Sequence, residues 1–190
     1  MRRAAIKSAY ILLSMILVLG LMVVPIVWGD NDEYGAQYGR RSTGVALISN
    51  PVYEDECGGD CHMAYQPGLL PDKSWEKIMS DLEDHFGDNA ELDTRTHKAI
   101  TDFLVANSAD KSNYRRSRRF TSSNDPGTIP IRISETSYFK HEHDEIPARM
   151  VTGNKDVNSF SNCNACHRRA EQASYRERDI FIPGHGRWDD

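Results

Sequence analysis

Apolar residues recur along positions 74–87 at the spacing of one helix face. The stripe consists of Trp75, Ile78, Met79, Leu82 and Phe86. Side chains three and four residues apart lie on one side of an α-helix and can face a core. Ser74 is a suitable N-cap and Gly87 a suitable terminating residue, so the pattern predicts a helix over 74–86.

A second helix is predicted to begin at Asp93 or Thr94. Its apolar stripe is Ile100, Phe103 and Leu104. Residues 50–71, which precede both helices, contain three prolines and are expected to form a loop.

The second half of the chain has weaker periodicity. Residues 107–130 are predicted to be a connector because turn-forming residues cluster at 122–127, and this connector contains a basic run at 115–119. A short strand is predicted at 129–133 and a short helix at 135–145, stopped by Pro147. A last helix is predicted to start at Ser159 or Ser161 and to continue to Ala173. The tail beyond it is polar except for an apolar patch at 180–182.

The first 29 residues have the pattern of an export signal. Arg2, Arg3 and Lys7 precede an apolar run at 10–24, and residues 25–29 resemble a cleavage region. Residues 9–28 are also long enough to span a bilayer, so an uncleaved N-terminal anchor is the alternative. Either way, the pattern predicts that residues 30–190 lie in the periplasm.

Without residues 1–29 the chain keeps 20 basic and 28 acidic residues, a net charge of −8. An acidic chain of this kind argues against nucleic acid as a partner. Its length of about 160 residues fits one domain with its own core.

The cysteines carry the strongest chemical signal. Cys163, Cys166 and His167 form a C-x-x-C-H motif, the spacing of a c-type haem attachment site. Each thiol can add to a haem vinyl group, and the histidine that follows can bind the iron. Upstream, Cys57, Cys61 and His62 repeat the arrangement with one more residue between the thiols.

The two motifs use all four cysteines of the chain, which favours two haems over two disulfides or a zinc site. The extra residue of the first motif lies beside Gly58 and Gly59, whose backbone can take unusual conformations. We therefore expect thioether bonds at both Cys57 and Cys61, although a single bond at Cys61 is the alternative.

Each iron needs a sixth ligand, and that ligand sets its potential and reactivity. His85 is on the predicted apolar stripe and is the preferred candidate near the first motif, with His97 as the alternative. Near the second motif, periodicity favours His143 over His141 without excluding either. His185 lies between two glycines in the tail and reads as a loop residue.

Short segments spread over most of the chain resemble the bacterial dihaem cytochrome c (DHC) family. They are Glu56-Cys57, Cys61-His62-Met63-Ala64-Tyr65, Pro67-Gly68-Leu69-Leu70-Pro71, Ser74-Trp75, His85-Phe86-Gly87, Asn89-Ala90, Glu142-His143-Asp144-Glu145-Ile146, Ser159-Phe160, Asn162-Cys163 and Ala165-Cys166-His167. The resemblance implies a mainly α fold, a small cytochrome c domain with two covalently attached haems and long connecting loops. It also implies His85 and His143 as the distal ligands. The widened first motif departs from the family's usual C-x-x-C-H.

The positions of the two motifs predict a first haem lobe at about 50–107 and a second haem lobe at about 131–185. A connector at about 108–130 is predicted between them. The leading functional hypothesis is a periplasmic single-electron carrier with two bis-histidine haems. The resemblance suggests a membrane b-type cytochrome or another quinol-linked donor and a periplasmic acceptor as partners. The alternative is a dihaem enzyme, a peroxidase or small-gas reductase, with one open haem position.

Overall fold

The computed structural model describes residues 44–59 and 61–188, all of which belong to one compact unit. The expected export signal or anchor at residues 1–29 lies outside the described residues. Within the described ranges, no helix is long and apolar enough to cross a membrane.

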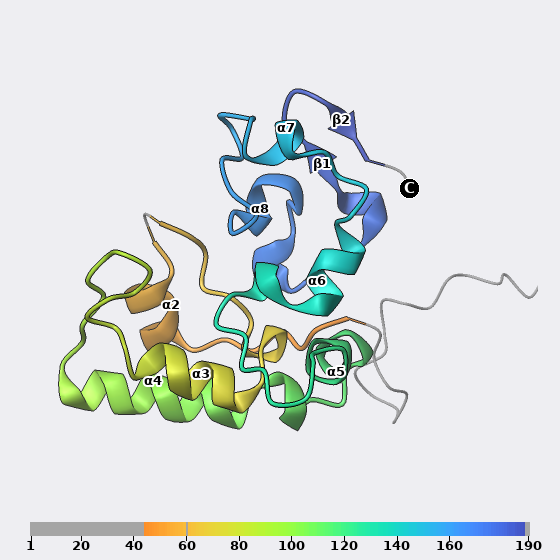
Figure 1. The fold of residues 1–190 in the computed structure, drawn as a ribbon. Helices are drawn as coiled ribbons and strands as arrows, with labels where there is room; N and C mark the ends of the chain where they lie inside the picture. The colour runs from red at the N-terminus through yellow and green to blue at the C-terminus, as the bar shows by residue number, and fades with distance from the viewer. Residues whose placement is uncertain (1–43, 60, 189–190) are drawn as a thin grey trace, which may run out of the picture. The chain divides into compact units, whose positions relative to one another are not determined.

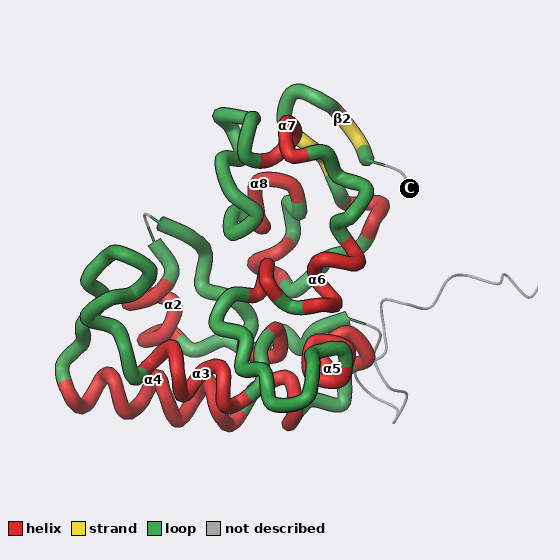
Figure 2. Tube along the Cα trace, viewed as in Figure 1, coloured by secondary structure: helices red, strands yellow, loops and turns green. Residues whose placement is uncertain are grey.

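Helices dominate the described part of the chain (Figures 1 and 2). Its seven α-helices are α2 (Pro51–Cys57), α3 (Asp72–Met79), α4 (Thr94–Ala106), α5 (Arg115–Ser122), α6 (Ser137–Glu142), α7 (Ala148–Val151) and α8 (Cys163–Cys166). Short 3-10 helices lie between them: η1 (Pro67–Leu69), η2 (Ala109–Lys111), η3 (Ile133–Glu135), η4 (Ala170–Gln172) and η5 (Glu177–Asp179). The strands β1 (Phe181–Ile182) and β2 (Gly186–Arg187) form one antiparallel hairpin in which Ile182 pairs with Gly186. The mainly α class is confirmed.

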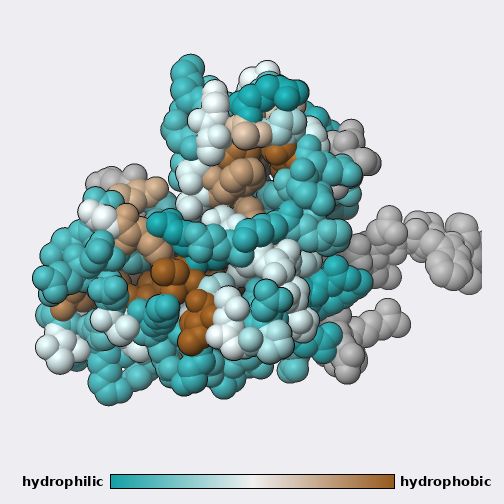
Figure 3. Space-filling view, in the orientation of Figure 1, coloured by the Kyte–Doolittle hydropathy of each residue, from teal (hydrophilic) through white to brown (hydrophobic). Residues whose placement is uncertain are grey.

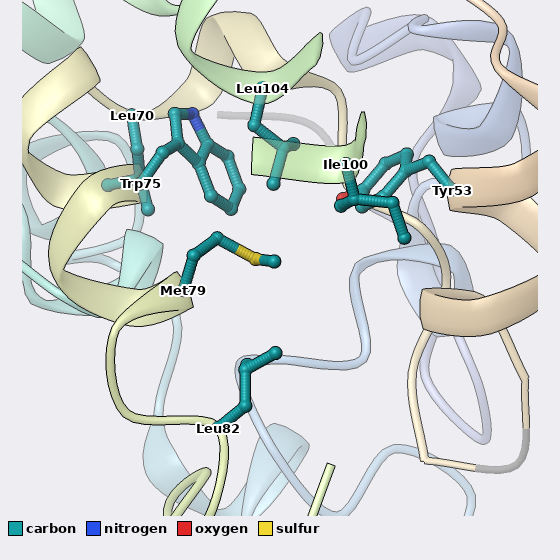
Figure 4. Packing of buried hydrophobic residues seen from close by; sticks show 7 residues of the cluster. All are labelled: Tyr53, Leu70, Trp75, Met79, Leu82, Ile100 and Leu104. Atoms are coloured by element: carbon teal, nitrogen blue, oxygen red, sulfur yellow. The ribbon is translucent and has the colours of Figure 1, made fainter. Parts of the chain in front are cut away.

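Helices α3 and α4 pack against each other and enclose the first hydrophobic cluster. Figure 4 shows its members, which are Tyr53, Leu70, Trp75, Met79, Leu82, Ile100 and Leu104. Helix α4 begins where the sequence predicts, because the Asp93 carboxylate accepts hydrogen bonds from the backbone N–H groups of Arg95 and Thr96. Its side chains Ile100 and Leu104 are fully buried, so the predicted stripe is confirmed for these two residues.

A second hydrophobic cluster joins residues from distant parts of the chain. Its buried members are Val45, Leu69, Ala109, Phe120, Tyr138 and Phe139. Phe120 comes from α5 and the last two from α6, and these helices are in contact. Tyr65 and Ile133 pack against both clusters, so the two cores are continuous through these side chains.

The helix predicted over 74–86 is shorter than expected, since α3 ends at Met79. Leu82 is still buried, but in a turn, and Phe86 is 41% exposed with a positive φ of 59°. The carboxylate of Asp84 accepts the Gly87 backbone N–H in this turn, a local bond that competes with helical hydrogen bonding. Gly87 therefore closes a turn and does not end the helix.

Three predictions for the second half are also wrong in detail. Residues 129–132 form no strand and have no regular secondary structure, and Ile133 begins η3. The last helix ends at Cys166 and does not reach Ala173. The basic run belongs to helix α5 rather than to a loop. The 135–145 helix exists as the shorter α6, and Pro147 precedes a further helix, α7.

Candidate functional site

Helix α8 is a single turn that contains both cysteines of the C-x-x-C-H motif. Residues three apart lie on the same side of a helix, so the Cys163 and Cys166 side chains project from one face. The backbone N–H of His167 donates to the Cys163 carbonyl over 2.8 Å and closes the turn. The helical turn thus places the two thiols on one face, with the His167 imidazole directly after them.

The first motif follows a different path, because Cys57 is the last residue of α2. Gly58 then leaves the helix in an extended conformation while its N–H still donates to the Glu54 carbonyl. A side chain at Gly58 would have its Cβ only 2.7 Å from that carbonyl oxygen and 3.0 Å from the Cβ of Ala64. Gly58 is therefore required for close packing rather than for a positive φ.

Each motif lines a cavity. The first cavity, of about 390 Å³, contains the first motif together with His85 and residues of α2, α3 and α4. The second cavity, of about 230 Å³, contains Cys163, Cys166, His167 and His143. Figure 3 shows apolar surface in brown near α2 and α3 and again near α8 and β1, elements that line the first and second cavity respectively.

Two histidine rings lie close together in each cavity, with their planes inclined by 47° in the first and by 74° in the second. The ring centroids of His62 and His85 are 6.2 Å apart, and those of His143 and His167 are 6.1 Å apart. The distance from an imidazole nitrogen to a bound first-row metal ion such as zinc is about 2.0–2.1 Å, and a similar distance is expected for iron. The centre of a five-membered ring lies about 1.15 Å from its nitrogen, so two rings that bind one iron from opposite sides would have centroids roughly 6.3–6.5 Å apart. The observed separations fit that arrangement.

Hydrogen bonds set which nitrogen of these rings can bind a metal. The Nδ1 of His62 lies 2.7 Å from the Met63 carbonyl, and the Nδ1 of His143 lies 2.9 Å from the Phe139 carbonyl. A carbonyl only accepts, so each Nδ1 carries the proton and each Nε2 keeps its lone pair. Phe139 also stacks on His143 with centroids 3.8 Å apart and fixes the ring further.

The other histidines are placed differently. The Nε2 of His97 donates to the Met79 carbonyl over 2.7 Å, which satisfies the ring within the protein. His141 is exposed on α6, and His185 is exposed in the turn between β1 and β2. None of the three lines either cavity. The structure therefore places the four histidines preferred from the sequence in pairs, one pair at each cavity. The histidines named as alternatives lie outside both cavities.

The surroundings of His167 lower its pKa strongly. Burial, followed by the neighbouring His143 and Arg116, lowers its pKa to about 4. The pKa of His85 is lowered too, first by burial and then by His62 and Arg132. A neutral imidazole is the form that binds a metal.

The cysteines and histidines of the two motifs fit a haem better than they fit disulfides or a zinc site. None of the four cysteines forms a disulfide. Among the described residues, no group of three or more His, Cys, Asp or Glu side chains is arranged to hold a metal ion alone, so a four-ligand zinc site is not assembled. Two thiols and two neighbouring imidazoles at an apolar cavity instead match what one covalently bound porphyrin iron requires.

Comparison with known proteins agrees with this geometry. The family model for dihaem cytochrome c matches residues 53–175, a span that contains both motifs and all four histidines. The chain belongs to the dihaem cytochrome c family. Members of this family carry two covalently bound haem c groups and transfer electrons, and both statements therefore apply to this dihaem cytochrome c.

Solved structures support the assignment. The dihaem cytochrome c of Shewanella baltica is 41% identical, with a TM-score of 0.61, over 75% of this chain and 100% of that one. The dihaem cytochrome c of Rhodobacter sphaeroides is 40% identical, with a TM-score of 0.60, over 70% of this chain and 100% of that one. No curated protein shows a significant match to the sequence.

The two cavities of this dihaem cytochrome c share a wall. Ile133, Phe160 and Cys163 line both of them. Tyr65 stacks on His62, with centroids 4.6 Å apart, and its hydroxyl donates to the Ser161 carbonyl over 2.6 Å. Tyr65 thus connects the ligand side of the first cavity to the segment that leads into α8.

Sequence reasoning missed the residues that support the ligands. Tyr65, Phe139 and Phe160 contact the histidine rings, and Arg116 and Arg132 each line one cavity. Arg116 was noticed as part of the basic run, and Tyr65 and Phe160 as part of the segments that resemble the family. The link made by Tyr65 could not be predicted, because its hydrogen bond to Ser161 spans 96 residues of sequence.

Proposed function

We propose that this dihaem cytochrome c is a periplasmic single-electron carrier in which both irons are bound by two histidines. His62 and His85 would hold the first iron, with thioether bonds at Cys57 and Cys61. His167 and His143 would hold the second, with thioether bonds at Cys163 and Cys166. The observation that carries this proposal is the pair of neighbouring imidazoles in each cavity, 6.2 and 6.1 Å between centroids.

When bound, each haem supplies one-electron chemistry through its iron. The side chains of this protein then have three tasks. His62 with His85, and His143 with His167, would each hold one iron through two imidazoles and leave no ligand position for a substrate. The carbonyls of Met63 and Phe139 hold the rings of His62 and His143 in orientation. The apolar walls limit the access of water to the iron.

The alternative function, a dihaem enzyme with one open position, has less support. Such an enzyme needs a cavity in which one imidazole faces the iron and the opposite side is free. Each cavity here contains two neighbouring imidazoles.

For redox partners we propose a membrane b-type cytochrome or another quinol-linked donor and a periplasmic acceptor. The wall shared by the two cavities supports a carrier that accepts an electron at one haem and delivers it from the other, since one layer of side chains separates them. Residues 9–28 would supply export or, if uncleaved, attachment to the inner membrane.

Carbon monoxide binding to single-histidine variants tests the ligands. The unmodified reduced protein should bind none, because both irons are six-coordinate. His85→Ala and His143→Ala should each open one iron, so that each variant binds one carbon monoxide per chain and keeps one low-spin haem.

The matched controls are His97→Ala and His141→Ala, which remove the alternative histidines and should leave both haems low-spin. If a control variant binds carbon monoxide while its partner, His85→Ala or His143→Ala, stays closed, that distal assignment is wrong. Binding of carbon monoxide by the unmodified protein would support the enzyme instead.

A further inference from the structure

The two cavities differ in the charge around them. Among the described residues, the carboxylates Asp55, Glu56 and Asp88 and the cation Arg132 line the first cavity. The second cavity is lined by Arg116 and by two carboxylates, Glu142 and Glu177.

One of these two carboxylates is partly neutralised. Glu142 lies 4.0 Å from the guanidinium of Arg119 and accepts a hydrogen bond from the Tyr138 hydroxyl over 3.1 Å. The first cavity is therefore the more electronegative of the two.

Arg116 is held toward the second cavity. Its Nη1 donates to the Tyr175 carbonyl over 3.0 Å, and Tyr175 contacts His167 edge-on with centroids 5.4 Å apart. The guanidinium is close enough to His167 to lower the pKa of that imidazole. Arg115, its neighbour on α5, is exposed and lines neither cavity.

The cavities also differ in their exposure to solvent. The lining of the first includes Cys61, Phe86, Asp88 and Asn89, all exposed. In the lining of the second, only the two glutamates are exposed. Water stabilises the more highly charged ferric state, so a drier site favours the ferrous state.

The two motif histidines also differ, although His143 at the second site donates to a carbonyl as His62 does at the first, so ligand hydrogen bonding does not separate the two sites. His62 donates its Nδ1 proton to a carbonyl, which makes the ring a stronger electron donor and favours ferric iron. The Nδ1 of His167 is buried and has no hydrogen-bond partner among the described residues. His167 is accordingly the weaker donor of these two motif histidines.

We propose that the second haem, bound at Cys163 and Cys166, has the higher reduction potential of the two, and that Arg116 is the positioning residue that raises it. Charge and exposure both act in this direction. An electron that enters at the first haem would then move to the second and remain there until an acceptor takes it. The inference rests on the proposed ligation of the second iron by His143 and His167.

The test is a potentiometric titration of the intact holoprotein followed by its visible spectrum. Arg116→Gln removes the charge, and Arg115→Gln removes one from the exposed neighbouring position as the control. At a fixed ambient potential, Arg116→Gln should lower the ratio of reduced to oxidised second haem about three- to tenfold, the effect of roughly one charge at a partly buried site. A tenfold change corresponds to about 59 mV for one electron.

The expected result is that Arg116→Gln moves only the higher of the two waves, and moves it downward, while Arg115→Gln moves neither. The proposal is overturned if the lower wave moves, if neither moves, or if both variants act alike. The spectra also report the ligation separately from the potentials. A low-spin spectrum means that both irons have two histidine ligands, and a high-spin component would show that the proposed ligation is wrong.

A second variant keeps the test decisive if Arg116→Gln does not fold. Glu56→Gln combined with Asp88→Asn removes two exposed charges from the first cavity. This change should raise the lower wave and leave the higher one in place. A rise of the higher wave instead would reverse the assignment.

Discussion

Tyr65 offers a quantitative test of how the two haem regions are joined. Its hydroxyl donates to the Ser161 carbonyl across 96 residues of sequence, and its ring stacks on His62. Tyr65→Phe deletes the hydrogen bond and keeps the stack. A part-buried hydrogen bond contributes about 0.5–1.5 kcal/mol, so the free energy of unfolding should fall by about 1 kcal/mol. Tyr65→Leu also removes the ring contact, which adds roughly 0.5–1.5 kcal/mol.

The assay is unfolding of the holoprotein in guanidinium chloride, followed by the haem spectrum and by far-UV circular dichroism. For a protein of this size, a slope of about 3–5 kcal/mol per molar denaturant converts 1 kcal/mol into a midpoint shift of roughly 0.2–0.3 M. The conversion assumes a two-state transition, and coincident unfolding curves from the two probes would show that this assumption holds.

The control is Tyr114→Phe, because no described residue accepts a hydrogen bond from the Tyr114 hydroxyl. It should shift the midpoint by less than the experimental error. The reasoning fails if Tyr65→Phe leaves the midpoint unchanged, or if Tyr65→Leu is no worse than Tyr65→Phe.

Three further predictions concern single residues. Both thiols of the first motif should form thioether bonds, so the pyridine haemochrome should have the band position of a haem without free vinyl groups; a red-shifted band with alkylation of Cys57 in the unfolded protein would contradict this. Ile100→Ala should lower the free energy of unfolding by about 2–5 kcal/mol, because Ile100 is fully buried; a loss below about 1 kcal/mol in chemical denaturation would show that the core relaxes around it. Hydrogen bonds from the Thr96 side chain and from the backbone lower the pKa of Asp93, so its stabilising effect should be present at neutral pH and lost as the pH falls through that lowered pKa. Thermal melts of Asp93→Ala and the unmodified protein should therefore differ at pH 7 and approach each other in acid, and a constant difference would argue against this role.

The sequence predicts most of the candidate site and less of the fold. Cys163, Cys166 and His167 are adjacent, so their joint chemistry is visible without a structure. His85 was selected as part of a helix stripe, yet it lies in a turn beyond the end of α3. The prediction of its place near the first motif survives because Leu82 and His85 both still turn toward the first cavity.

The missed features depend on contacts that local patterns do not encode. Helix α8 stops after one turn, although the sequence beyond it could continue a helix. Residue Ala173 takes a left-handed conformation at the end of η4, and His167 pairs its backbone with that of Ile180. Likewise, the division of the basic run into Arg116 at a cavity and Arg115 in solvent follows from the rotation of α5 against α6.

The brevity of the helices around the second cavity affects how the protein is made. Helices α6, α7 and α8 have six, four and four residues, far below the length at which an isolated helix persists in water. Their apolar side chains, such as Phe139 and Val151, line a cavity that the prosthetic group completes. Before attachment the chain therefore has little to fold around, and its thiols stay open to the attachment machinery. In cells short of haem, we therefore expect this protein to be degraded rather than to accumulate in an empty form.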